Sequence, residues 1–111
     1  MKMQYTYDEE VDAISVNIRA EKSDMTIQLG QHIRIDITND WKHVGVEIRN
    51  ASDEISKIFG RVITKNEIRE LLCSIRKKPS NEYVIRFKLP QKNESASYVI
   101  PLCHRPILSH A

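Results

Sequence analysis

Residues 32–49, with the sequence HIRIDITNDWKHVGVEIR, decide the fold class. Branched apolar residues alternate with polar ones on both sides of a polar segment, at Ile33, Ile35, Ile37, Val44, Val46 and Ile48. A period of two residues is typical of a half-buried antiparallel strand with one apolar and one polar face. The pattern therefore predicts a β-hairpin that turns near residues 39–42 and pairs Ile37 with Val44.

The same alternation precedes this hairpin in three further segments, MKMQYTY, DAISVNI and MTIQL. Placing apolar residues opposite one another predicts turns around 8–11 and 20–23. The predicted pairs are Tyr5–Ile14, Met3–Val16 and Ile18–Met25. The first half of the chain is therefore predicted to form a four- or five-strand meander, in which 25–29 and 33–37 are either two strands or one bent strand.

The second half of the chain carries a helix signal followed by two strand signals. Thr64 and Glu67 form a capping-box pattern. An apolar stripe follows at i, i+3, i+4 and i+7, namely Ile68, Leu71, Leu72 and Ile75. This spacing predicts an amphipathic helix over 65–77 that covers the apolar face of the sheet. A shorter helical turn is expected over 52–59 before Gly60, and the segments EYVIRFKL and SASYVIPL predict a C-terminal hairpin.

Length and composition fit one small folded domain, because the chain has 111 residues, of which 41% are hydrophobic and 29% charged. The predicted fold is α+β: an antiparallel β-meander sheet covered on one face by a single amphipathic helix, plus a C-terminal β-hairpin. The single domain spans 1–111, with 1–53 forming the meander and 54–111 the extension. The sequence shows no signal peptide and no run of about 20 apolar residues, so a cytoplasmic protein without membrane contact is expected.

The segments YDEEVDAISVNI, GQHIRIDIT and VGVEIRNAS occur in this order within residues 4–53. This part of the chain resembles a family of short prokaryotic proteins, domain-of-unknown-function family 2283. The resemblance implies a small antiparallel sheet and no catalytic residue. Members often look like the antitoxin-type half of small two-gene systems, which implies a protein-binding role. The chain departs from the family pattern at Glu9, where proline is frequent, and at 39–41, where Asn-Asp-Trp replaces Asp-Gly and makes Trp41 a candidate interaction residue.

Four carboxylates crowd into residues 8–12. Asp8, Glu10 and Asp12 are the candidate site of an acid-cluster, metal-dependent enzyme, although the spacing of a calcium-binding EF-hand loop is absent. The favoured interpretation is a turn. Asp8 is expected to accept a hydrogen bond from the backbone two residues on, and Asp12 is expected to begin the next strand.

Polar residues are predicted to face one another on the outer side of the central hairpin: Arg34 with Glu47, His32 with Arg49, His43 with Thr38, and Asp36 with Gly45. No serine or cysteine is expected among them, so a nucleophile with its base is not predicted there. The thiols and imidazoles elsewhere lack the paired spacing of a zinc site; they are Cys73, Cys103, His104 and His110. The sequence predicts no enzyme activity and no cofactor.

Charge is distributed unevenly along the chain. Residues 1–59 carry 7 basic and 11 acidic side chains, whereas residues 60–111 carry 10 basic and 4 acidic ones. Seven basic residues on the predicted helix and hairpin are candidate nucleic-acid contacts: Lys65, Arg69, Arg76, Lys77, Lys78, Arg86 and Lys88. Glu67 and Glu70 interrupt this surface, and no aromatic residues are interleaved for base stacking.

The sequence therefore favours a non-enzymatic protein-interaction module. The expected partner is a small protein, in an antitoxin-like arrangement, or a second copy of the chain in a homodimer or other homo-oligomer, because open strand edges invite pairing. The alternative is a nucleic-acid-binding regulator that uses the basic C-terminal half. The third hypothesis is the metal-dependent enzyme at the acid cluster.

Overall fold

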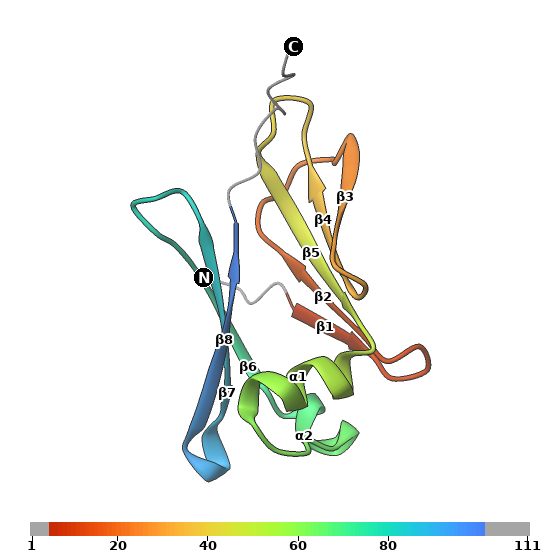
Figure 1. The fold of residues 1–111 in the computed structure, drawn as a ribbon, viewed down its shortest axis with the longest axis vertical. Helices are drawn as coiled ribbons and strands as arrows, with labels where there is room; N and C mark the ends of the chain where they lie inside the picture. The colour runs from red at the N-terminus through yellow and green to blue at the C-terminus, as the bar shows by residue number, and fades with distance from the viewer. Residues whose placement is uncertain (1–4, 102–111) are drawn as a thin grey trace, which may run out of the picture.

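The computed structural model describes residues 5–101, which form two antiparallel β-sheets with two α-helices at one end (Figure 1). The first sheet contains β1 (Tyr5–Asp8), β2 (Ala13–Asn17), β3 (Met25–Leu29), β4 (Ile33–Ile37) and β5 (His43–Arg49). The second sheet contains β6 (Leu72–Lys77), β7 (Tyr83–Leu89) and β8 (Glu94–Ile100). The helices α1 (Ala51–Phe59) and α2 (Lys65–Arg69) connect the sheets, and a 3-10 turn, η1 (Pro90–Lys92), joins β7 to β8. The predicted α+β class is confirmed.

The strand order of the first sheet is β1-β2-β5-β4-β3, so β5 lies between two hairpins. The predicted hairpin over 32–49 is confirmed as β4–β5, and 25–29 and 33–37 are two strands that pair with each other. The predicted hairpin through Ile18–Met25 is wrong, because β2 pairs with β5 instead. Alternation determines which face each strand buries, but several partners can satisfy it. The most buried strand, β5, takes the centre.

The register of the first hairpin differs from the prediction by two residues. Tyr5 lies opposite Val16 and Tyr7 opposite Ile14, rather than Met3 opposite Val16 and Tyr5 opposite Ile14. A shift of two residues keeps every side chain on its predicted face because the side-chain period of a strand is two.

An irregularity at Asp36 and Ile37 changes the pairing at the end of the β4–β5 hairpin. Ile37 lies opposite His43, so the predicted pairs Ile37–Val44 and Thr38–His43 are wrong. His43 is buried at 3% exposure rather than displayed on the polar face.

The predicted helix over 65–77 is correct only in its first turn. The capping box is present, since Thr64 Oγ1 accepts a hydrogen bond from the Glu67 backbone N–H and Glu67 Oε1 accepts one from the Thr64 N–H. α2 ends at Arg69, and β6 then pairs with β7. As the alternation of a strand requires, Cys73 is buried and its neighbour Leu72 is 54% exposed. Pairing with β7 therefore outweighs the helical spacing in this segment.

The shorter helical turn expected over 52–59 is confirmed as α1 and ends at Gly60 as predicted. Gly60 adopts a φ of 74°, and its N–H donates to the Ser56 carbonyl at 2.9 Å. Such a left-handed residue closes a helix with least strain when it is glycine. Ala51 and Ile55 are fully buried. Tyr98 Oη donates to the Glu54 carbonyl, so α1 is also held against β8.

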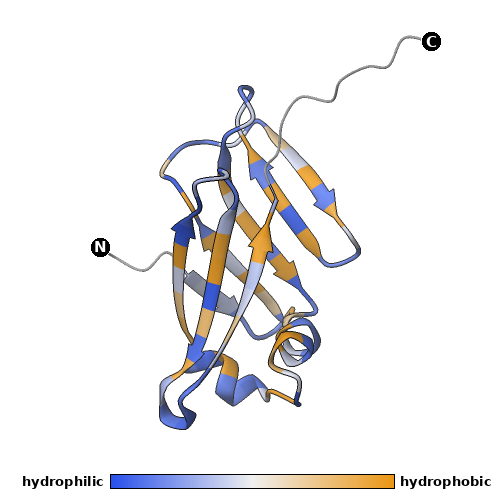
Figure 2. Cartoon of the chain, turned by 60° about the vertical axis from the view of Figure 1, so that its left-hand side comes forward, coloured by the Kyte–Doolittle hydropathy of each residue, from blue (hydrophilic) through white to orange (hydrophobic). Residues whose placement is uncertain are grey.

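The apolar faces of the two sheets contribute to one shared core. The rings of Tyr5 and Phe87 lie 6.2 Å apart edge to face, and those of His43 and Tyr83 lie 5.0 Å apart. Figure 2 shows the alternation of hydrophobic and hydrophilic residues along strands of both sheets. The second sheet, together with the helices, therefore supplies cover for the first sheet. No helix within residues 5–101 has the length and apolar character needed to cross a bilayer.

Candidate interaction surface and polar hollow

The acid cluster is a turn whose carboxylates serve the fold. Asp8 Oδ1 accepts the Glu10 backbone N–H at 3.1 Å, which is the predicted bond two residues on. Asp12, expected to begin the next strand, instead lies in the turn with a φ of 52°. Its carboxylate accepts hydrogen bonds from Tyr7 Oη at 2.6 Å and Ser52 Oγ at 2.6 Å.

Asp12 also caps α1 from a distant part of the chain. Its backbone carbonyl accepts the Ala51 N–H at 2.8 Å and its carboxylate accepts the Ser52 N–H at 3.1 Å. The local N-cap residue, Asn50, makes no side-chain capping bond. Burial raises the pKa of the Asp12 carboxyl, but the hydrogen bonds from Ser52 and Tyr7 outweigh burial and hold the pKa below its usual value. Asp12 is therefore an ionised anchor between the first hairpin and the first helix.

The seven candidate basic residues fall into two groups, those that form an ion pair and those that do not. Arg69 pairs with Glu9 at 3.0 Å and Lys78 with Glu82 at 3.9 Å. The other five make no salt bridge with a carboxylate of residues 5–101, namely Lys65, Arg76, Lys77, Arg86 and Lys88. Four of these five lie on the neighbouring strands β6 and β7, and the register places three of them, Arg76, Arg86 and Lys88, on one face of the sheet, with Lys77 on the other.

The outer face of the second sheet is cationic. Strand register places three rows on it: Leu72, Lys88 and Ser95; Ser74, Arg86 and Ser97; and Arg76, Val84 and Val99. We call these nine residues the basic face. It contains three cations, no carboxylate and no aromatic ring. Among the side chains of residues 5–101, Arg86 reaches only the hydroxyl of Ser95, at 3.3 Å.

The β6 strand forms one edge of the second sheet and pairs, within residues 5–101, with β7 alone. Leu72, Ser74, Arg76 and Lys77 are exposed along it. The strand contains neither proline nor a carboxylate. Every second residue of an edge strand directs its backbone N–H and C=O away from the sheet. β6 can therefore accept another strand.

Two other predicted residues, Trp41 and Cys73, contribute to the packing of the core. Trp41 is half-buried and packs against the core, with its backbone N–H donating to the Thr38 carbonyl at 3.0 Å. Cys73 is buried, and burial raises the pKa of its thiol to about 11. Cys103, His104 and His110 lie outside the described residues. Among residues 5–101, no three His, Cys, Asp or Glu side chains come together in a manner suited to a metal ion.

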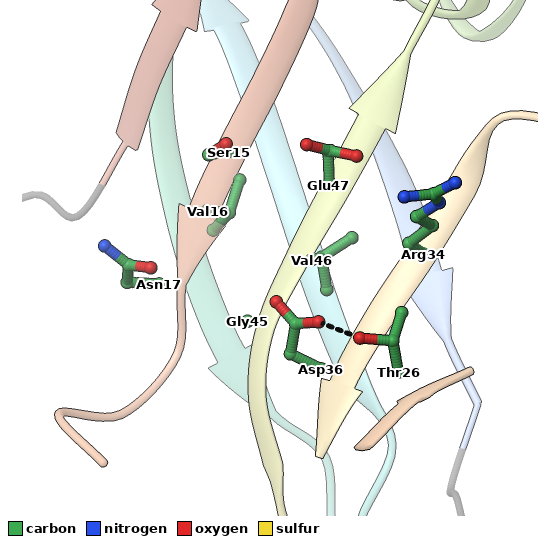
Figure 3. Close-up of a pocket in the computed structure, with 9 residues that line it drawn as sticks. All are labelled: Ser15, Val16, Asn17, Thr26, Arg34, Asp36, Gly45, Val46 and Glu47. Atoms are coloured by element: carbon green, nitrogen blue, oxygen red, sulfur yellow. Dashed lines mark hydrogen bonds between the residues drawn. The ribbon is translucent and has the colours of Figure 1, made fainter. Parts of the chain in front are cut away.

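The outer face of the first sheet contains a polar hollow of about 210 Å³ (Figure 3). Gly45, in the central strand, forms its floor, and Asn17 and Asp36 lie beside it in the same row. The neighbouring row supplies Ser15, Glu47 and Arg34. Thr26 Oγ1 donates to Asp36 Oδ1 at 2.8 Å. Gly45 has no side chain, whereas the neighbouring strands β2 and β4 carry polar side chains on either side of it. The surface of the sheet is therefore recessed at Gly45.

Sequence reasoning found only half of this hollow. It correctly placed Arg34 opposite Glu47 and Asp36 opposite Gly45. It missed Ser15 and Asn17, because it paired β2 with β3 instead of β5. Ser15 therefore lies on this polar face in addition to the positions that the sequence analysis paired there. The alternation itself was a signal for this pairing. In Ser15-Val16-Asn17, as in Gly45-Val46-Glu47, the apolar valine lies between two residues of the polar face.

The fold and these surfaces define an α+β protein of two antiparallel sheets, in which the cationic strand β6 has one neighbouring strand among residues 5–101. Residues 4–52 match the model of a family described as a protein of unknown function, DUF2283. The match is partial and covers the first sheet and the start of α1, as the sequence resemblance predicted. Comparisons with curated proteins and with solved structures found no match.

Proposed function

We propose that this protein is a non-enzymatic protein-interaction module whose second sheet binds an extended acidic segment of a protein partner. The observation that carries the proposal is a set of three cations on the basic face that form no ion pair within residues 5–101: Arg76 on the edge strand β6, and Arg86 and Lys88 on the neighbouring strand β7. A partner strand would add to β6 through backbone hydrogen bonds, in the manner known as β-augmentation. Its carboxylates would face the three cations of the basic face.

The charge of β6 supports a different protein as the partner rather than a second copy of the chain through this edge. Two copies of β6 paired with each other would place four cations, Arg76 and Lys77 of each chain, on two adjacent strands that contain no carboxylate. Like charges on adjacent strands are destabilising. An acidic strand removes this repulsion and is compatible with an antitoxin-like, cytoplasmic role.

Nucleic acid is the alternative anionic partner. The aromatic residues of the second sheet, Tyr83, Phe87 and Tyr98, belong to the inner rows of the register and leave the basic face without a stacking platform. Single-stranded nucleic acid is usually held by aromatic stacking as well as by charge. The basic face therefore favours a peptide over a nucleic acid.

The test titrates the full chain with three labelled probes: the peptide VEVEVEV, its neutral counterpart VSVSVSV, and a short oligothymidylate with the charge of the acidic peptide. Fluorescence anisotropy gives affinity, and NMR amide shifts give the location. The proposal expects the acidic peptide to bind most tightly and to shift the amides of β6. Salt should weaken binding because the attraction is electrostatic.

Two charge-matched triple variants sharpen the test. Arg76→Ser/Arg86→Ser/Lys88→Ser should weaken peptide binding by about tenfold or more, which corresponds to about 1.4 kcal/mol. Lys22→Ser/Lys42→Ser/Arg49→Ser removes three cations from the first sheet and its loops and should leave binding unchanged. Tighter binding of the oligothymidylate would replace the proposal with nucleic-acid binding. Failure of all three probes to bind would overturn the proposed surface.

A further inference from the structure

In the hollow, several oxygen atoms surround the point directly above Gly45 that a side-chain carbon of residue 45 would occupy. A side-chain carbon at Gly45 would lie 3.2 Å from the Val16 carbonyl oxygen, 3.7 Å from Asn17 Oδ1 and 3.9 Å from Asp36 Oδ2. Hydrogen bonding to Thr26 occupies the other oxygen of Asp36, Oδ1, and thereby holds the carboxylate in place. Glu47 supplies a second carboxylate to the lining (Figure 3).

Convergent acceptors suit a group that only donates hydrogen bonds. A primary ammonium has three N–H donors, no acceptor and a positive charge. The lining carries two carboxylates, Asp36 and Glu47, against one guanidinium, so its formal charge is negative. That guanidinium, on Arg34, donates through Nε to Gln28 Oε1 at 3.3 Å, on the side of β3.

We propose that this hollow binds a primary alkylammonium group. The group would enter above Gly45 and donate to Asn17 and Asp36, with Glu47 adding electrostatic attraction. Its source is either a free diamine or a lysine side chain of another protein. This site lies on the first sheet and does not depend on the proposed peptide binding at the second.

A divalent metal ion fits the hollow less well than an ammonium does. Calcium takes six to eight oxygen ligands at about 2.3–2.6 Å. The lining offers two carboxylates, those of Asp36 and Glu47, and no three His, Cys, Asp or Glu side chains within residues 5–101 are grouped as a metal site requires. An N–H donor needs only about 2.9 Å to each acceptor and can approach from the open side.

The experiment is an NMR titration of the full chain with three small probes. They are 1,4-diaminobutane, the methylamide of Nα-acetyl-lysine, and 1-butanol as an uncharged control. The two amines should shift the backbone amides of Gly45 and its row neighbours Asn17 and Asp36, and 1-butanol should not. Tighter binding of the diamine would indicate a free polyamine, and tighter binding of the lysine derivative would indicate a protein side chain.

Variants test whether the hollow itself is responsible. Asp36→Asn keeps an acceptor for Thr26 but removes a charge, and should weaken amine binding by about tenfold. Gly45→Ala places a methyl group on the floor of the hollow, where the ammonium would lie, and should weaken binding by about tenfold or more. Asp53→Asn removes a carboxylate from α1 and should have no effect. The wild-type titration alone can overturn the proposal, if neither amine shifts these amides, or if 1-butanol shifts them equally.

Discussion

The two sheets share a core but differ on their outer faces. The first sheet mixes charges of both signs around its hollow, whereas the basic face of the second carries only cations. Within residues 5–101, one ion pair joins the acidic first half to the basic second half, between Glu9 and Arg69 at 3.0 Å. The unequal charges of the two halves are therefore displayed to solvent rather than neutralised against each other. Among residues 5–101 the cations of the basic face form no ion pair, which is the feature on which the proposed peptide binding rests.

The largest effect is expected where the two sheets meet. Phe87 is fully buried and its ring contacts those of Tyr5 and Tyr98. Phe87→Ala should lower the free energy of unfolding by about 3–5 kcal/mol, since it removes a large ring and leaves a cavity. Urea denaturation followed by circular dichroism measures this loss.

Val62, which is 78% exposed, provides the control for that measurement. Val62→Ala should change stability by less than about 0.5 kcal/mol. The wild-type chain should unfold in one transition, because both sheets bury the same core. Two separate transitions, with Phe87→Ala affecting only one of them, would show that the sheets are independent units.

The next largest effect is expected in the rates at which thiols at positions 72 and 73 are alkylated, which distinguish a strand from a helix in this segment. Burial raises the pKa of the Cys73 thiol to about 11, and the thiolate is the reacting form. Alkylation of Cys73 at pH 8 should be about a hundredfold slower than that of an exposed thiol. Leu72→Cys places such a thiol next to it, and peptide mass spectrometry distinguishes the two sites. A helix over 65–77 would bury position 72 instead, so faster alkylation at Cys73 than at the introduced thiol would contradict the strand.

A smaller effect is expected at the link between the first hairpin and α1. Asp12→Ala should reduce stability by about 1–2 kcal/mol, because the Ser52 N–H at the helix start and the hydroxyls of Ser52 and Tyr7 lose their charged acceptor. Asp53→Ala, which alters an exposed carboxylate on the same helix, is the control. Equal losses from the two variants in thermal unfolding would show that Asp12 is not the cap.

The pH dependence of this link follows from the lowered pKa of Asp12. The folded state favours the ionised carboxylate, so the stabilisation is complete above the unfolded-state pKa of about 3.9. It is lost as pH falls through the lower folded-state pKa. The stability difference between wild type and Asp12→Ala should therefore be constant from neutral pH to about 5 and shrink below about 4.

The smallest effect is expected on the basic face. Arg86 is exposed and, among the side chains of residues 5–101, reaches only a serine hydroxyl. Arg86→Ser should change stability by less than about 0.5 kcal/mol. Destabilisation of about 1 kcal/mol or more in the same urea assay would show that the fold depends on this cation, and would weaken the case for a binding surface.

The sequence predicts some elements of this fold far better than others. The β4–β5 hairpin, the α1 stop at Gly60 and the capping box at Thr64 are all local features, set by alternation or by residues a few positions apart. The position of β5 between β2 and β4 depends on competition among strands with similar patterns. The end of α2 depends on β7, which needs a neighbour for its buried Phe87. Such choices are made by tertiary packing, which a local pattern does not contain.

The candidate sites show the same division. The interpretation of Asp8 as a turn residue is confirmed, because its bond spans two residues. The role of Asp12 was not predicted, since its partner Ser52 lies 40 residues away. Ser15 and Asn17 were missed at the hollow because their neighbours come from a non-consecutive strand. The grouping of Arg76, Arg86 and Lys88 was predicted in outline, but on a helix and hairpin rather than on two paired strands.

The central place of β5 also determines the order in which the first sheet can assemble during synthesis. β1–β2 and β3–β4 are complete before β5 emerges, and each hairpin alone is at best marginally stable in water. Translation needs on the order of a second to add the dozen residues from the end of β4 to the end of β5. For that interval the inner edges of β2 and β4 lack the strand that will join them. Nascent chains paused before residue 43 should therefore be the form of this protein most prone to aggregate and most dependent on chaperones.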